Sequence, residues 1–455
     1  MFFRKIVSEG LAHNSYIVGS KGVAVVIDPR RDCEIYLDIA REQEFTITSI
    51  FETHRNEDYC IGSLDLAGRC GAKIYHGNNP AFLYGNPVKE GMKFTLGLIE
   101  LAVLETPGHT EDSISLALTD KEVADQPYMI FCGDTLFAGD IARTDFYGDA
   151  RKGEMAAKIF DSISLKILAL GDGVIICPAH GAGSVCGEMI ADHPFTTAGY
   201  ERLTNPSLIL GRSAFIAERE HESPYYPPYF RTMEDYNSKG PSPLSRFPEF
   251  FPLPIAEVNK LRASGCQIID IRSPTSFAAG HIPKSLSIWR DGLASFMGWF
   301  LDYEKPIIIV DDFNLELSSV FPQFVRLGYD NVAGYLAGGF SAWSKAGQET
   351  EMIPGYSAQQ LKERLLAEKI FLLDVRDIKN RAREGSIPGS QHRYIGELPH
   401  HLDEIPHNIP IVAYCDSGYK GSMATSILVA QGYSPAGNLL GGIAGWKRAG
   451  FEIEH

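Results

Sequence analysis

Residues 47–60, ITSIFETHRNEDYC, run from an apolar, strand-like segment into a turn that carries His54. Four other apolar segments among the first 181 residues have the length and composition of buried strands, at 22–29, 99–110, 127–135 and 173–181. The last three of these also end in turns with side chains of a metal-binding type: His109, Asp134 and His180. Loops that follow buried strands gather functional side chains on a rigid scaffold. We therefore expect these strand ends to converge on one site.

Composition limits the classes of function. The chain has 455 residues, which corresponds to about three domains. Its formal net charge of −15 argues against nucleic acid or an anionic membrane as a partner, because both are bound through clustered Lys and Arg. No apolar run has the length of a signal-peptide core or a membrane span, and the eight cysteines show no paired spacing. We expect a cytoplasmic protein that acts on a small molecule.

A segment rich in proline and aromatic residues divides the chain. Residues 223–251 begin with SPYYPP and end with GPSPLSRFPEFF. Because proline disfavours regular structure, we predict an extended linker there. The predicted domains are then residues 1–222, 252–350 and 355–455.

The part of the chain after this linker repeats itself. Three pairs of segments match at a spacing of about 100 residues: QIIDIRS (267–273) with FLLDVRD (371–377), GHIPKS (280–285) with GSIPGS (385–390), and YLAGGFSAW (335–343) with NLLGGIAGW (438–446). A repeat of this length is a domain rather than a solenoid unit. Each copy places short β-type runs between helical segments, so we predict two tandem α/β domains with mostly parallel sheets.

The second copy contains a candidate nucleophile. A buried-looking strand at 409–414 leads directly into Cys415, and CDSGYKGS (415–422) then starts a helix. Such a loop can point several backbone N–H groups inward, and the helix N-terminus adds positive potential. Both favour a thiolate, which is the nucleophilic form of cysteine. The alternative is a small buried residue without a chemical role.

These residues resemble the rhodanese (sulfurtransferase) family. DVR (374–376), SIPGS (386–390), CDSGYKGS (415–422) and LLGGIAGW (439–446) stand in the family's order and spacing. The resemblance implies that Cys415 accepts a sulfane sulfur as a persulfide, with thiosulfate as a donor. It also implies that the loop cradles this sulfur, and that Lys420 holds an anionic substrate. The residues of this cradle are Asp416, Ser417, Gly418, Tyr419 and Lys420.

The first copy departs from this pattern at the decisive position. Its strand at 306–310 leads into DDFNLELSS, and the repeat offset places Asp312 opposite Cys415. A carboxylate cannot carry sulfur, and this loop lacks the glycine found at Gly418. We therefore predict that residues 252–350 form a rhodanese-like domain without sulfurtransferase activity, with a structural or docking role.

The segments ETHRNED, TPGHT, CGDT and PAHG resemble the motifs of the metallo-β-lactamase fold, a sandwich of two sheets flanked by helices. The usual first motif, T-H-x-H-x-D-H, reads here as Thr53, His54, Asn56, Asp58 and Tyr59, so two of its histidines are replaced. Asparagine is a poor neutral ligand, and tyrosine does not supply the imidazole that zinc favours. A two-zinc hydrolase is therefore disfavoured.

The persulfide dioxygenases, one branch of this fold, hold a single iron with residues that correspond to His54, His109 and Asp134. All three are present. Two histidines and one carboxylate leave open positions for substrate and dioxygen, as in other non-haem Fe(II) oxygenases. Further segments resemble this branch, especially its members fused to rhodanese domains: 26–40, 62–75, 133–146, 178–187 and 200–208. The resemblance implies one Fe(II) per chain, no organic cofactor, and a persulfide of glutathione, coenzyme A or a similar thiol as substrate.

Other residues near these motifs receive supporting roles. We predict that Asp58 and His180 orient the metal ligands or face the substrate, since metal ligands need oriented partners. Tyr59 either donates a hydrogen bond to substrate or packs. Arg143 either binds a substrate carboxylate or forms a surface salt bridge. The cysteines other than Cys415 are predicted to be packed thiols.

Two alternatives stay open at this point. The protein is a sulfurtransferase alone if the first domain is a metal-free scaffold or binding module. It is a structural or interaction protein if Cys415 has no sulfur chemistry either. We expect a homo-oligomer.

Overall fold

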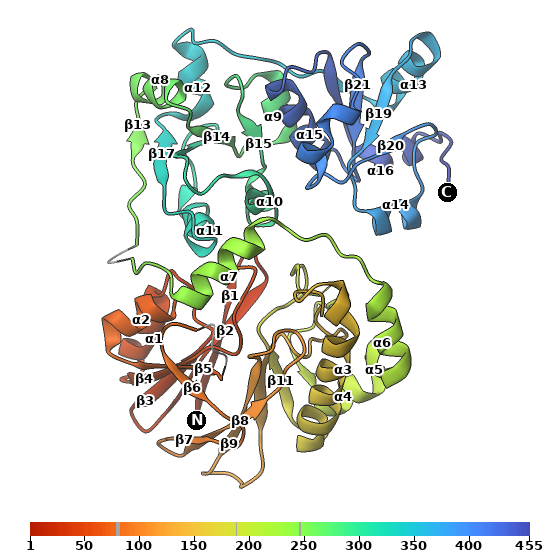
Figure 1. Cartoon of the computed structure of the whole chain (residues 1–455). Coiled ribbons are helices and arrows are strands. Elements are labelled where there is room, and N and C mark those ends of the chain that lie inside the picture. Colours follow the sequence, from red (N-terminus) through yellow and green to blue (C-terminus); the bar gives the residue numbers. More distant parts are fainter. Residues whose placement is uncertain (79–81, 188, 245–246) are drawn as a thin grey trace. The chain divides into compact units, whose positions relative to one another are not determined.

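The computed structural model describes residues 1–78, 82–187, 189–244 and 247–455. The chain forms two compact units (Figure 1): Met1–Pro248 together with Val325–Gly328, and Glu249–Phe324 together with Tyr329–His455. Residues 245 and 246 of the predicted linker lie outside the described residues.

The first unit contains two six-stranded sheets. One sheet has the order β1 to β6, formed by Phe2–Ser8, His13–Ser20, Val23–Ile27, Thr46–Phe51, Lys73–Gly77 and Asn86–Val88. The other has the order β12 to β7, and β7 to β12 are Lys93–Leu96, Ile99–Glu105, Ile114–Asp120, Met129–Gly133, Ile175–Pro178 and Thr196–Thr197. The five strands predicted from the sequence are confirmed as β3, β4, β8, β10 and β11.

The two sheets pack face to face, with helices on their outer faces. Strand β3 shows why its sequence is apolar throughout: Val25 and Ile27 face the core between the sheets, whereas Ala24 and Val26 face the helical layer. A strand buried on both faces lacks the usual polar alternation. The helices of this unit, α1 to α7, are Glu34–Glu42, Ser63–Cys70, Lys152–Ser162, Ala198–Thr204, Pro206–Ile209, Arg212–His221 and Tyr229–Lys239. This arrangement confirms the predicted sandwich.

The second unit contains two five-stranded sheets in which every pairing is parallel. The first, ordered β13-β17-β16-β14-β15, has strands β13 to β17 at Pro252–Leu253, Gln267–Asp270, Leu286–Ser287, Ile307–Val310 and Val332–Leu336. The second, ordered β18-β22-β21-β19-β20, has strands β18 to β22 at Gly355–Tyr356, Phe371–Asp374, Gln391–His392, Ile411–Tyr414 and Ala436–Leu439. The identical strand order confirms the tandem repeat.

Helices cover these sheets in both copies (Figure 1). The first copy contains α8 to α12, at Ile255–Ala263, Pro274–Ala279, Leu293–Phe300, Phe321–Arg326 and Gly339–Lys345. The second contains α13 to α16, at Ala358–Ala367, Ile378–Glu384, Tyr419–Ala430 and Gly442–Arg448. Trp343 and Trp446 are fully buried at matching places in the two cores. Each copy therefore has its own core.

Strand register corrects one detail of the repeat. In the first copy β14 pairs Asp270 with Val310, and in the second copy β19 pairs Asp374 with Tyr414. The residue after Val310 is Asp311, so Asp311, and not Asp312, corresponds to Cys415. The sequence offset was wrong by one because the matched segments differ slightly in spacing.

The predicted linker is not extended throughout. Tyr229–Lys239 form α7, which begins directly after the Pro227 and Pro228 pair. Proline is compatible with the start of a helix because the first helical N–H groups have no intrahelical partner. The buried face of this helix consists of Tyr229, Phe230, Met233 and Asn237.

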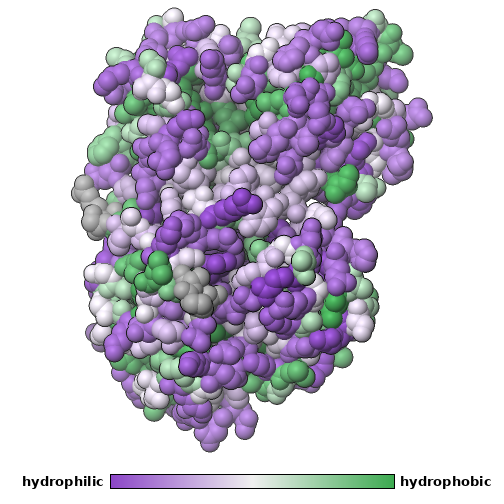
Figure 2. Space-filling view, viewed as in Figure 1, coloured by the Kyte–Doolittle hydropathy of each residue, from purple (hydrophilic) through white to green (hydrophobic). Residues whose placement is uncertain are grey.

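The molecular surface fits the acidic, charge-rich composition. The face seen in Figure 2 is mainly hydrophilic. None of the helices in the described part of the chain has the length and apolar character needed to cross a membrane.

Candidate metal centre and sulfur-transfer loop

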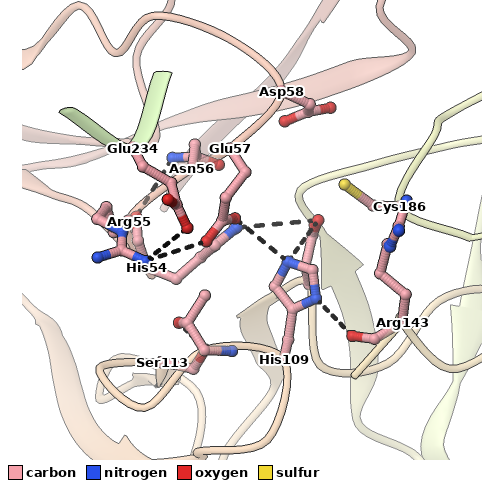
Figure 3. Close-up of polar contacts among 12 residues, drawn as sticks. His54, Arg55, Asn56, Glu57, Asp58, His109, Ser113, Arg143, Cys186 and Glu234 are labelled. Carbon is pink, nitrogen blue, oxygen red and sulfur yellow. Dashed lines mark hydrogen bonds and ion pairs between the residues drawn. The ribbon is translucent and has the colours of Figure 1, made fainter. Parts of the chain in front are cut away.

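Three predicted metal ligands meet at the ends of strands in the first unit, and Figure 3 labels two of them, His54 and His109. His54 follows β4, His109 follows β8 and Asp134 follows β10, and each is at most 2% exposed. The Nε2 atoms of His54 and His109 lie 3.8 and 3.6 Å from Asp134 Oδ2. The structure therefore brings together the residues that the sequence placed in one site.

A chain of hydrogen bonds orients His54. Thr53 donates its backbone N–H and its hydroxyl to the Asp28 carboxylate at 2.7 and 2.8 Å. Because the hydroxyl proton of Thr53 is directed at Asp28, its Oγ1 accepts from His54 Nδ1 at 3.0 Å. Gly133 has φ +54°, and a Cβ there would lie 2.5 Å from Thr53 Oγ1, so the glycine before Asp134 gives Thr53 its room.

His109 is oriented in a similar way. Its Nδ1 donates to the backbone carbonyl of Arg143 at 2.9 Å, which leaves Nε2 as the basic nitrogen. Within the described residues, neither His109 Nε2 nor His54 Nε2 has a hydrogen-bond partner. Burial lowers the pKa of His54 to about 3 and also lowers the pKa of His109, so both imidazoles are neutral near pH 7. Two neutral, unpartnered nitrogens facing a carboxylate are a donor set that fits a metal ion.

Asp134 is held by His180, whose Nδ1 lies 2.7 and 2.9 Å from the two carboxylate oxygens. His180 Nε2 lies 2.9 Å from Asp58 Oδ2. Burial opposes the charge on His180, but the two carboxylates raise its pKa well above the usual value. Burial likewise opposes ionisation of Asp134, but the charge and hydrogen bond of His180 keep its pKa well below the usual range. Asp134 is therefore ionised and fixed in place.

The second predicted site is the loop that follows β21. Cys415 is 1% exposed, and its Sγ accepts a hydrogen bond from the Gly418 N–H at 3.1 Å. Gly418 has φ +102° and immediately precedes α15. Asn438 donates to the Gly418 carbonyl at 2.8 Å and fixes the turn. The sulfur thus lies at the N-terminal end of a 12-residue helix.

The other residues of this loop differ in exposure. Asp416 and Lys420 are half-buried and form an ion pair with an Nζ to Oδ2 distance of 3.1 Å, whereas Ser417 and Tyr419 are exposed. A groove of about 500 Å³ beside Asp416 is lined by basic and acidic side chains, those of Arg383, Lys447, Arg448, Glu384 and Asp416. Arg383 and Lys447 both pair with Glu384, at 3.2 and 2.7 Å.

Comparison with known families agrees with this geometry. Residues 9–180 match the metallo-beta-lactamase superfamily, and residues 255–346 and 357–449 each match the rhodanese-like domain. The crystal structure of a metallo-beta-lactamase from Staphylococcus aureus is 31% identical, with a TM-score of 0.66, and the match covers 74% of this chain and 99% of that chain. The chain belongs to the metallo-beta-lactamase superfamily and carries two rhodanese-like domains.

Individual enzymes of this superfamily are also similar to the first unit. Hydroxyacylglutathione hydrolase GloC of Haemophilus influenzae is 28% identical over 207 residues, which are 41% of this chain and 87% of that protein. A hydroxyacylglutathione hydrolase of Hahella chejuensis is 36% identical over 143 residues, which are 29% of this chain and 50% of that protein. The chain thus consists of enzyme-family domains, and hydroxyacylglutathione hydrolases are among its relatives.

The two residues that replace motif histidines are buried, and within the described residues Asn56 Oδ1 and the Tyr59 hydroxyl have no hydrogen-bond partner. Asn56 donates from Nδ2 to the backbone carbonyl of His54 at 3.3 Å. Tyr59 is 1% exposed and its ring lies 3.9 Å from that of His13. Asn237 of α7 donates to the backbone carbonyls of both Asn56 and Tyr59 at 2.7 Å. The helix inside the predicted linker therefore holds the first motif, which the sequence did not indicate.

Arg143 is engaged inside the protein. Its guanidinium forms two hydrogen bonds with Asp145, at 2.7 and 2.6 Å, and lies over the rings of Phe146, Tyr226 and Phe230. The residue is 7% exposed. Its salt bridge with Asp145 is therefore internal rather than on the surface, and its backbone carbonyl orients His109. A substrate-binding role for Arg143 stays a prediction.

Two residues at this centre were missed. Glu57 is 1% exposed, and its Oε2 lies 3.7 Å from His109 Nε2. Cys186, predicted to be a packed thiol, is buried, and its Sγ lies within 4.8 Å of the ligand atoms of Asp58 and His180. Neither has a sequence signal of its own, because Glu57 occupies a variable position of the motif and Cys186 lies in a loop after the PAHG segment.

Proposed function

We propose that the protein is a persulfide dioxygenase coupled to a sulfurtransferase. The observation that carries this proposal is the pair of unpartnered Nε2 atoms of His54 and His109 facing the ionised Asp134, on a chain that also holds Cys415 at a helix N-terminus. One site suits oxidation of a sulfane sulfur and the other suits its transfer. A shared substrate class explains why both stand on one chain.

The metal of the first site is proposed to be one Fe(II), held by His54, His109 and Asp134. Two imidazoles and one carboxylate suit Fe(II) and leave positions open. When bound, the iron supplies the place at which dioxygen and the persulfide sulfur meet. One position that a second zinc would need is altered, since Tyr59 stands in place of a histidine and packs on His13. No organic cofactor is proposed.

The protein side chains would prepare the site for the overall reaction RSSH + O2 + H2O → RSH + SO3²⁻ + 2 H⁺. Thr53 and the Arg143 carbonyl fix the two imidazoles with Nε2 free. His180 keeps Asp134 ionised and in place. Burial of these groups excludes bulk water, which strengthens their electrostatic interactions. A cavity of about 210 Å³ borders His180 and is lined mainly by apolar side chains, among them Tyr16, Ile176 and Phe195.

Cys415 would transfer sulfur by nucleophilic attack. Its thiolate attacks the sulfane sulfur of thiosulfate, the S–S bond to the sulfonate breaks, and sulfite leaves with the bond electrons while Cys415 becomes a persulfide. A low-molecular-weight thiolate then takes the sulfur and restores the Cys415 thiolate. Glutathione and coenzyme A are thiols of the proposed class. The resulting persulfide would be the substrate of the metal site.

The test is oxygen uptake by the full-length protein after anaerobic loading with Fe(II), with glutathione persulfide as substrate. We expect O2 consumption and sulfite formation in equal amounts, together with about one iron per chain. His109→Ala should lose both iron and O2 uptake. His221→Ala, which removes an exposed histidine of α6, is the matched control and should retain both.

Other outcomes identify the alternatives. An iron-free protein that consumes no O2 but forms thiocyanate from thiosulfate and cyanide would be a sulfurtransferase with a metal-free first domain. Hydrolysis of S-D-lactoylglutathione without O2 uptake would instead place the protein with its hydroxyacylglutathione hydrolase relatives. Either result would overturn the dioxygenase proposal.

A further inference from the structure

We propose that the Glu57 carboxylate is an additional ligand of the metal at His54, His109 and Asp134. This chain would then hold its metal with two histidines and two carboxylates. The inference rests on the metal site of the proposed function, but it concerns a residue to which neither the motif resemblance nor the family matches assign a role.

The position of Glu57 points to this role. It lies in the loop between β4 and α2, three residues after His54, and its side chain extends between Arg55 and His109 (Figure 3). Ligand atoms of His54, Glu57 and His109 all lie within 4.8 Å of one another. Two ligands bonded to one ion at about 2.1 Å lie about 3 to 4 Å apart, so the 3.7 Å between Glu57 Oε2 and His109 Nε2 is compatible with a shared ion.

The hydrogen bonding of Glu57 is incomplete. Among the described residues, neither carboxylate oxygen has a hydrogen-bond donor. The neighbouring cation, Arg55, has its Nη2 3.6 Å from Glu57 Oε1, and the same nitrogen donates to Glu234 at 3.1 Å. A buried carboxylate without donors is costly. A cation between Glu57, His54 and His109 would satisfy orphaned atoms on all three side chains at once.

The inference also accounts for the altered motif. The histidine expected at position 56 is replaced by Asn56, whose amide is turned to the backbone of His54. Glu57, the next residue, supplies a donor to the same region. Because a carboxylate is a harder donor than an imidazole, the exchange favours Fe(II) or Mn(II) over zinc. With Asp134, a second carboxylate would also neutralise the charge of a divalent ion.

The experiment measures metal binding rather than turnover. Full-length apo-protein is titrated anaerobically with Co(II), whose visible spectrum reports its ligands, and affinity is obtained by competition with a chelator. We expect Glu57→Gln to weaken Co(II) binding at least about tenfold and to change the visible bands. The matched control is Glu234→Gln, which removes the other carboxylate on Arg55 but does not approach His109. It should bind Co(II) like the wild type.

Wild-type affinity and an unchanged spectrum in folded Glu57→Gln would overturn the inference. If Glu57→Gln does not fold, as judged by circular dichroism, Glu57→Asp is used, because it keeps the charge and shortens the side chain by one methylene. A changed Co(II) spectrum in Glu57→Asp supports the inference, and an unchanged one overturns it. Equal loss of affinity in Glu57→Gln and Glu234→Gln would assign the effect to Arg55 and would also overturn it.

The failure of this inference differs from that of the proposed function. A protein that binds Co(II) through Glu57 but shows no O2 uptake with a persulfide overturns the dioxygenase and leaves the ligand assignment standing. A protein with O2 uptake whose Glu57→Gln variant keeps full metal affinity overturns only the ligand assignment. Absence of metal binding in the wild type overturns both.

Discussion

The two rhodanese-like copies share a scaffold and differ at one loop. In both, the residue after the central strand accepts from a backbone N–H three residues on: Cys415 Sγ from Gly418 at 3.1 Å, and Asp311 Oδ1 from Asn314 at 3.0 Å. In both, its carbonyl accepts from the next glycine-rich turn, from Ile443 at 2.8 Å and from Phe340 at 2.7 Å. The backbone pattern is therefore retained where an aspartate, Asp311, replaces the cysteine.

The corresponding loop of the first copy contains additional side-chain hydrogen bonds. Asn314 also donates from its side chain to Asp311 Oδ1 at 2.7 Å and to the Leu336 carbonyl at 2.9 Å. In the first copy Asn314 thus ties this loop both to Asp311 and to the end of a neighbouring strand. A structural role without turnover stays a prediction for this copy.

Removal of the nucleophile should have the largest effect. Cys415→Ser is expected to lower kcat/KM for thiocyanate formation from thiosulfate and cyanide at least about a thousandfold, because a hydroxyl cannot form the persulfide. Asp311→Ser changes the matching residue of the first copy and should leave this activity unchanged. A clear loss of activity in Asp311→Ser would show that the first copy takes part in sulfur transfer.

The shared scaffold can be tested through a buried ion pair present in both copies. Asp270 accepts from Arg272 at 2.6 Å, and Asp374 accepts from Arg376 at 2.7 Å. Asp270→Ala and Asp374→Ala should each lower the free energy of unfolding of their own copy by about 3 kcal/mol, because a buried guanidinium is left unpaired. Amide hydrogen exchange of β14 and β19 in the full chain localises the two losses.

An exposed pair provides the control for this comparison. Arg364 of α13 and Glu368, the residue directly after this helix, form an ion pair at 2.6 Å but are 25% and 41% exposed. Glu368→Ala should change stability by less than about 0.5 kcal/mol. A neutral result for Asp270→Ala beside a large loss for Asp374→Ala would show that the two scaffolds are not equivalent.

Much of the fold followed from the sequence because buried strands are apolar and because the second copy repeats the first. The errors have local physical reasons. Asp312 was matched to Cys415 by counting, whereas strand register identifies Asp311. Helix α7 was missed because its two prolines were taken as helix breakers, although proline is compatible with a helix start.

The candidate site was predictable only in part. His54, His109 and Asp134 stand at strand ends, so the pattern of the sheet brings them together. Glu57 depends on the path of an irregular loop, which a sequence pattern does not specify. Asn237 donates a hydrogen bond to Tyr59 in that loop, and the two residues are 178 positions apart in the sequence. Such long-range contacts leave no local signal.

Substitution of Gly418, in the loop after Cys415, should have an intermediate effect on sulfur transfer. Gly418 has φ +102°, and a Cβ there would lie 3.2 Å from the Leu439 carbonyl and 3.3 Å from the Gly441 nitrogen. Gly418→Ala should lower kcat/KM for sulfur transfer about tenfold, because the turn would shift to relieve a strain of about 1 to 2 kcal/mol. Gly432→Ala is the control, since Gly432 has φ +85° with open space around it. Equal kcat/KM values for the two variants would show that the conformation of Gly418 is not needed for sulfur transfer.

The smallest expected effect is a loss of stability at acid pH that is confined to the first copy. His281 is buried in the first copy, where the second copy has Ser386, and burial lowers the pKa of His281 to about 4. Because this value lies below the unfolded value of about 6.5, the folded state binds fewer protons, and stability is lost as the pH falls from about 6.5 toward 4. We expect a loss of about 1 kcal/mol in the first copy at pH 5, because Glu351, with Oε2 3.7 Å from His281 Nε2, offsets part of the effect. Hydrogen exchange of β14 and β16 at pH 7 and pH 5 measures this loss, with β19 and β21 as the internal reference. The loss should disappear in His281→Ser, and its persistence there would assign the acid sensitivity to another group.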